Sequence, residues 1–179
     1  DKPKIPVVSI FTRNQGDAAK IAKAFYLQNP IYKWVTFKEL RGLTRAQFAE
    51  ELGKSCLAVW IDDITGFGTF PIEAIECETP VIGKMPNMIP EWMEHKDENG
   101  NFTIANNGVW TNTTLNIPEL IATYLKVWLE DSVPTNLTDT MNAFKGRYTT
   151  EAQKIAIADI YGKLVEERKL EYTQILNSQ

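Results

Sequence analysis

The segment from Leu57 to Gly83 constrains the fold more than any other part of this sequence. Its first five residues are apolar and rich in strand-forming side chains, as in a fully buried strand. A glycine-containing turn follows, then a helix with an apolar stripe, and a second apolar run begins at Val81. Strand, helix and strand in this order predict a βαβ crossover, the unit from which parallel sheets are built.

The turn inside this unit has features of an anion-binding loop. Gly66 and Gly68 stand between the strand and the helix, where a missing side chain lets the backbone approach a ligand. The helix that follows offers free N–H groups and the positive end of its dipole. Both attract phosphate, so the turn is a candidate site for a phosphorylated ligand.

Glu73 has two interpretations from the residues alone. Pro71 suits the first position of the helix, so Glu73 is expected in the first turn, beside the same site. There its carboxylate could accept hydrogen bonds from sugar hydroxyls. In the second interpretation Phe70 is the N-cap, and a glutamate three residues later only stabilises the helix start.

The preceding sequence extends this unit to a sheet. Apolar runs at residues 5–11 and 34–37 are predicted strands, and helices are predicted to start at Asp17 and at the capping box of Thr44 and Gln47. The order βαβαβαβ with short connections predicts an α/β fold, a mostly parallel sheet flanked by helices on both faces.

The part of the chain after Gly83 is predicted to be looser and then helical. Short β-like pieces at 102–104 and 108–110 are two further strand candidates, placed at the ends of the same sheet. Three helices are predicted after them, near 116–128, 136–144 and 150–176. We expect residues 1–130 to form the sheet domain and residues 131–179 to form a C-terminal helical extension packed on it.

Composition and charge argue against several classes of protein. The net charge is −4 without a basic stripe, which argues against nucleic acid as a main partner. No apolar run is long enough for a membrane span. Cys56, Cys77 and His95 are too few and too scattered for zinc, so no metal and no cofactor are predicted. The start at Asp1 without an apolar leader suggests a processed chain or an excised domain, and the default location is cytoplasmic.

Two cations near the start of the chain are candidates for holding an anion. Arg13 leaves the carboxyl end of the first predicted strand, and in open α/β sheets that edge holds the ligand. A guanidinium can grip a phosphate with two hydrogen bonds. Lys20, one turn into the next helix, is a second candidate, although a helix lysine also serves simply as a solvated surface residue.

The central segment resembles the nucleotide-sugar half of retaining GT-B glycosyltransferases of the group 1 type. That family has a glutamate, Gly-Phe-Gly, a second glutamate after four residues, and a Gly-Thr-Pro-Val ending; the matching residues here are Thr65–Ala74 and Cys77–Ile82. The resemblance covers about residues 5–130. It implies a Rossmann-like domain, one half of a GT-B fold, that binds a nucleoside diphosphate sugar.

The resemblance also implies roles for individual residues. Glu73 matches the second glutamate, which in the family binds the ribose hydroxyls. Arg13 matches the cation that stabilises the leaving diphosphate, where fixed donors lower the barrier. Thr65 stands at the position of the first glutamate, which touches the donor sugar. The predicted catalytic residues are therefore Arg13 and Thr65, and the predicted substrate-binding residues are Gly66, Phe67, Gly68, Thr69, Glu73 and Lys20.

The departures from the family keep two alternatives open. Thr65 carries no charge, Glu78 replaces a usual glycine, and the family's lysine falls near Ala18, so only Lys20 could replace it. Transfer also needs an N-terminal acceptor-binding domain, so this domain alone should bind its ligand without turnover. One alternative is a degenerate, non-catalytic nucleotide- or sugar-binding module. The other is a flavodoxin-like or receiver-type domain that uses Asp62–Asp63 as an acidic site.

Overall fold

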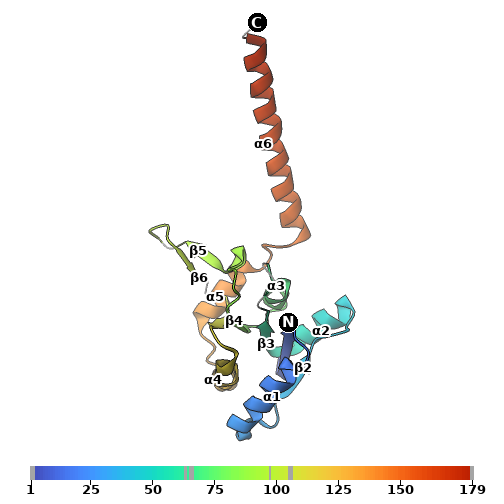
Figure 1. Cartoon of the computed structure of the whole chain (residues 1–179), viewed down its shortest axis with the longest axis vertical. Coiled ribbons are helices and arrows are strands. Elements are labelled where there is room, and N and C mark those ends of the chain that lie inside the picture. Colours follow the sequence, from blue (N-terminus) through green and yellow to red (C-terminus); the bar gives the residue numbers. More distant parts are fainter. Residues whose placement is uncertain (1–2, 63, 65–66, 97, 105–106, 178–179) are drawn as a thin grey trace. The chain divides into compact units, whose positions relative to one another are not determined.

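The computed structural model describes residues 3–62, 64, 67–96, 98–104 and 107–177 of the chain (Figure 1). Its contacts divide the chain into two compact units, Asp1–Lys145 and Gly146–Gln179. The first unit is an α/β domain, and the second contains one long helix, α6 (Thr150–Asn177). Among the helices of the described ranges, none combines the length and the apolar content that crossing a membrane requires.

The first unit is built on a five-stranded parallel sheet, which confirms the predicted α/β fold class. The strand order is β2-β1-β3-β4-β7. The strands are β1 (Ile5–Thr12), β2 (Thr36–Glu39), β3 (Ser55–Ile61), β4 (Val81–Lys84) and β7 (Val109–Thr111). The central strand β3 is buried at every position, as its apolar run predicts, because helices cover both faces of a parallel sheet.

Helices lie on both faces of the sheet (Figure 1). On one face, α1 (Asp17–Gln28) packs against α4 (Ile117–Leu129). On the other face, α2 (Arg45–Lys54) packs against α3 (Thr69–Glu76), and α5 (Thr135–Phe144) packs on α3. Short 3₁₀ turns follow or precede these elements: η1 (Pro30–Tyr32), η2 (Glu91–Met93) and η3 (Thr114–Asn116).

Two predicted strands differ from the structure. The strand expected at 34–37 is β2, two residues later, because the chain is still turning after η1 and the N–H of Val35 donates to the carbonyl of Tyr32 at 3.0 Å. The piece at 102–104 does not join the main sheet. It forms β6 (Phe102–Ile104), which pairs antiparallel with β5 (Glu94–Lys96) in a separate two-stranded sheet. Local β propensity does not specify the pairing partner.

The start of α3 also differs from prediction. Gly68 is the N-cap, with a left-handed φ of 65°, so the helix begins at Thr69 rather than at Pro71. Pro71 is then the third helical residue, where its missing N–H is still one of the four that lack an intrahelical partner. Glu73 becomes the fifth residue of α3, so it lies neither at N3 nor in the first turn, and both expected positions are wrong.

Three tryptophans pack together over a glycine of the sheet. Trp60 of β3, Gly83 of β4 and Trp110 of β7 are register partners across three neighbouring strands. The rings of Trp60 and Trp110 meet edge-on at a centroid distance of 6.1 Å, and Trp92 of η2 completes the group. A Cβ on Gly83 would lie 2.5 Å from the Trp110 ring, so glycine leaves the space that this tryptophan cluster occupies.

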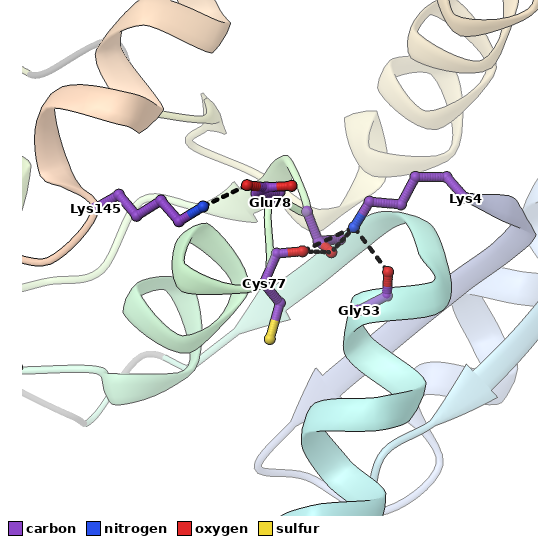
Figure 2. A network of polar contacts seen from close by, with 6 residues as sticks. Lys4, Gly53, Cys77, Glu78 and Lys145 are labelled. Carbon is purple, nitrogen blue, oxygen red and sulfur yellow. Dashed lines mark hydrogen bonds and ion pairs between the residues drawn. The ribbon is translucent and has the colours of Figure 1, made fainter. Parts of the chain in front are cut away.

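Lys4 joins the ends of α2 and α3 (Figure 2). Its ammonium donates to the carbonyl of Gly53 at 2.9 Å, to the carbonyl of Cys77 at 2.8 Å and to Thr79 Oγ1 at 2.7 Å. These three bonds use all three ammonium hydrogens. A cation is favourable at this place because the carbonyl ends of two helices converge on it.

The residue after Cys77 takes a backbone conformation that L-residues seldom adopt. Glu78 has a φ of 57°, the left-handed value expected where the resembling family has glycine. Its N–H donates to the carbonyl of Ile75 at 2.9 Å, and its carboxylate accepts a hydrogen bond from Lys145, as Figure 2 shows. The ion pair with Lys145 lowers the pKa of Glu78.

Candidate functional site

The strand order places a topological switch point between β1 and β3. β1 leads into α1 on one face of the sheet, whereas β3 leads into α3 on the opposite face. In open α/β sheets, ligands bind in the crevice outside the carboxyl ends of the strands at such a point. Thr12 and Ile61 are the last register pair of the two strands, so Arg13 and Asp62 stand side by side at the crevice.

Arg13 and Asp62 form a two-pronged ion pair at this point. Arg13 Nε lies 3.1 Å from Asp62 Oδ1, and Nη2 lies 3.0 Å from Oδ2. The Asp62 side chain is only 3% exposed, whereas that of Arg13 is 51% exposed. The hydrogen bond with Asp62 is the largest cause that raises the pKa of Arg13. Sequence reasoning missed this pair, although both residues directly follow a predicted strand.

The buried carboxylate of Asp62 is held from its own loop as well. The backbone N–H of Ile64 donates to Asp62 Oδ1 at 3.0 Å. Asp62 is therefore engaged by Arg13 and Ile64 rather than open as an acidic ligand, and Asp63 lies outside the described residues. Among the described residues, no three His, Cys, Asp or Glu side chains gather closely enough to hold a metal ion.

The side chains two residues before Arg13 and Asp62 face α3. Phe11, two residues before Arg13, stacks on Phe70 of α3 with a centroid distance of 5.1 Å. Trp60, two residues before Asp62, lies under the N-cap of α3. Arg13 and Asp62 directly follow these two strands, at the carboxyl edge of the sheet.

Glu73 lies on α3 and faces α2. Cys77, one turn further along α3, has its Sγ 3.9 Å from the carbonyl of Ala49 on α2. One turn back on each helix brings Glu73 opposite Arg45. Glu73 is exposed, and among the described residues its carboxylate makes no hydrogen bond and no ion pair. Partial loss of hydration raises its pKa, and the charge of Arg45 opposes that effect.

This raised pKa predicts a small pH-dependent cost to stability. Below the ordinary carboxylate pKa, Glu73 is neutral in the folded and in the unfolded chain. As the pH rises from this ordinary pKa to the raised pKa of the folded protein, Glu73 ionises more readily in the unfolded chain, and its ionisation therefore favours unfolding. Glu73→Gln is therefore expected to match the wild type near pH 4 and to be more stable at pH 7, by only a few tenths of a kcal/mol because the group is exposed. Chemical denaturation at both pH values tests this, and a less stable variant at pH 7 contradicts it.

Gly68 is required by the fold itself. A Cβ at Gly68 would lie 2.6 Å from the Trp60 ring, and its φ of 65° is costly for other residues. The carbonyl of Phe67 accepts a hydrogen bond from Trp92 Nε1, which fixes the turn before α3. Thr69 is exposed at the first position of α3. The remaining predicted residues of this turn, Thr65 and Gly66, lie outside the described residues.

Lys20 lies apart from these residues. It is on α1, which packs on the opposite face of the sheet, and its ammonium is 2.9 Å from the carboxylate of Asp17. Asp17 and Lys20 line a cavity of about 260 Å³ between α1 and the start of α4, next to Ile61 and Leu115. The structure thus places Gly68, Thr69 and Glu73 on one face of the sheet and Lys20 on the other, with Arg13 at the carboxyl edge beside Asp62.

Arg41 is a further cation at this edge that sequence reasoning did not single out. Its Nη2 donates to the carbonyl of Thr12, the last residue of β1, at 3.1 Å. Its Nε donates to the carboxylate of Glu39 at 3.0 Å. Its position in the sequence could have identified it, because Arg41 closely follows β2, as Arg13 and Asp62 follow their strands.

Comparisons with known proteins bear on the fold. No protein-family profile matches the chain, and no curated protein matches it. A solved structure described as "Crystal structure of GtfA/B complex" is similar, with a TM-score of 0.52 and 12% sequence identity. The similarity covers 90% of this chain and 37% of that chain, so this chain spans little more than a third of its length. The chain has a Rossmann-like α/β fold similar to that of the matched structure.

Proposed function

We propose that this chain is the donor-binding half of a GT-B glycosyltransferase and binds a nucleoside diphosphate sugar. The observation that carries the proposal is the topological switch point between β1 and β3, where Arg13 follows β1 and where β3 leads to the amino end of α3, the helix that carries Glu73. The Rossmann-like fold, similar to that of the GtfA/B structure, supports it. The resemblance of the segment from Thr65 to Ile82 to the GT-B nucleotide-sugar half supports it independently of the coordinates.

The chemistry of these groups suits the parts of such a ligand. Arg13 offers a half-exposed guanidinium to a diphosphate, whose negative charge grows as the sugar leaves. The amino end of α3 adds unpaired N–H groups for phosphate oxygens. Glu73 offers a carboxylate that is not bonded within the described residues, and two adjacent ribose hydroxyls could donate to it.

An acceptor-binding partner domain is part of the proposal. Three loops at the carboxyl edge of the sheet expose large apolar side chains: Ile64 after β3 is 75% exposed, Met88 after β4 is 68% exposed and Leu115 after β7 is 81% exposed. Exposed apolar groups gathered around a candidate site are typical of surfaces that another protein covers. Closure of a partner domain would exclude water, so the isolated domain should bind its donor without transferring the sugar.

Glu73→Gln tests the donor site. We expect it to weaken binding of the preferred nucleotide at least tenfold, about 1.4 kcal/mol, because an amide oxygen accepts hydrogen bonds from hydroxyls less strongly than a carboxylate. A thermal-shift panel of UDP, GDP and ADP identifies the nucleotide, and calorimetry measures the affinity. Glu119→Gln is the matched control, a first-turn carboxylate on α4. Equal affinity of the Glu73 variant and the wild type would remove Glu73 from the site.

A degenerate, non-catalytic binding module is the second candidate function. The observation in its favour is that both cations assigned to the diphosphate already have carboxylate partners, Arg13 with Asp62 and Lys20 with Asp17. Nucleotide binding by a full-length protein that transfers no sugar would support this candidate. Transfer to an acceptor would support the enzyme.

A further inference from the structure

We propose that Asp62 is a positioning residue that orients the Arg13 guanidinium toward the phosphate groups of the ligand. This inference rests on the proposed function, because it concerns the same crevice. It assigns to Asp62 a role different from that of the acidic site considered for Asp62–Asp63. Asp62 acts only through Arg13 and does not touch the ligand.

The geometry of the pair fixes the plane of the guanidinium. Two nearly parallel bonds, 3.1 Å and 3.0 Å, leave Arg13 no freedom to rotate about the contact. The backbone of Arg13 is also held, since its N–H donates to the carbonyl of Ile61 at 3.4 Å. On the other side, the N–H of Ile64 holds Asp62 Oδ1 at 3.0 Å. The carboxylate is thus anchored to its own loop, and Arg13 is anchored to the carboxylate.

Asp62 and Arg13 differ in burial, and this difference indicates different roles. Asp62 is 3% exposed at its side chain and presents almost no surface to a ligand, whereas Arg13 is 51% exposed. Burying a carboxylate is costly, and an apolar side chain of similar size often stabilises a fold better. The buried position of Asp62 is explained if its function is to hold the exposed guanidinium of Arg13 in one orientation.

Simple charge effects and positioning predict opposite results when Asp62 is neutralised. If Asp62 only contributes its charge, Asp62→Asn removes a negative group near an anionic ligand and tightens binding. If Asp62 positions Arg13, the same change weakens binding, because the single amide oxygen is shared with Ile64 and the amide nitrogen cannot accept a bond from Arg13. The sign of the change in affinity therefore separates the two roles.

The test measures dissociation constants of UDP, GDP and ADP by calorimetry, with thermal unfolding of each variant in parallel. We expect Asp62→Asn to weaken binding at least fivefold and Arg13→Gln at least tenfold. The double variant should equal Arg13→Gln, because Asp62 acts only through Arg13. Glu51→Gln is the matched control; it breaks another strand-to-helix ion pair, that of Lys38 with Glu51 at 2.6 Å, and should stay within twofold of the wild type.

Each outcome decides the proposal. The positioning role is overturned if Asp62→Asn binds the nucleotide as tightly as the wild type or more tightly, or if the losses of affinity add up in the double variant. In either case the proposed function stands as long as Arg13→Gln still binds the nucleotide weakly. Failure of the wild type to bind any of the three nucleotides overturns both. If Asp62→Asn does not fold, Asp62→Glu carries the test. It keeps the negative charge, but its longer side chain displaces the guanidinium, so binding should weaken at least fivefold; unchanged binding overturns the proposal.

Discussion

Replacing Gly83 with alanine is expected to destabilise the α/β unit by about 3 kcal/mol, an overpacking cost at the upper end of the usual range. The added Cβ would lie 2.5 Å from Cζ3 and 2.9 Å from Cε3 of Trp110, and 3.0 Å from the carbonyl oxygen of Trp60. The backbone oxygen cannot move without disturbing β3, and Trp110 is confined by Trp60 and Trp92. Differential scanning calorimetry should show the melting temperature lowered by roughly 6–12 °C.

Two further variants make this prediction specific. Gly53→Ala is the matched control, because a Cβ at this position in α2 meets no atom within 4 Å; it should leave stability unchanged or raise it by up to about 1 kcal/mol. In a Trp110→Leu background, Gly83→Ala should cost less than half as much, because the clashing ring is gone. An equal cost in both backgrounds would show that Trp110 is not the source of the strain.

Replacing Lys4 with methionine is the second large effect we expect, a loss of about 2–3 kcal/mol in the free energy of unfolding. Hydrogen bonds from a charged donor contribute about 1.5–3 kcal/mol each, but the side chain is only partly buried, so water replaces part of what is lost. The ends of α2 and α3 would lose their shared donor, since the bonds to Gly53, Cys77 and Thr79 all come from this ammonium. Urea denaturation measures the loss.

The control for Lys4 is an ordinary surface lysine. Lys54→Met removes an exposed pair with Glu50, four residues earlier on α2, and should change stability by less than about 0.5 kcal/mol. Hydrogen exchange gives a second readout: in the Lys4 variant, amides of the last turns of α2 and α3 should exchange faster than those of α1. Equal stability of the two lysine variants would contradict the role given to Lys4.

Local sequence signals were sufficient to predict several elements of the structure. The apolar run from Leu57 to Ile61 became the fully buried strand β3, and the capping box of Thr44 and Gln47 formed with both of its hydrogen bonds. In each case the physical cause lies within a few residues of the chain, in side-chain periodicity or in hydrogen bonding to neighbouring backbone.

The start of α3 shows where local signals fail. Proline suggested a helix beginning at Pro71, but the helix begins at Thr69 because Gly68 adopts a left-handed φ above the ring of Trp60. That ring comes from the preceding strand and is held by Trp92 and Trp110. A glycine read as a sign of a bound ligand is thus already required by packing.

The sequence by itself determined the order of strands and helices as far as β4, the parallel α/β class and the position of Arg13 at the end of the first strand, because these depend on periodicity and on short connections. Only the tertiary structure decided which of these residues meet. The register of β1 with β3 brings Arg13 to Asp62, 49 residues apart. The crossover of α1 to the opposite face from α3 separates Lys20 from Glu73. Such pairings arise from the packing of distant strands and helices, which no local pattern encodes.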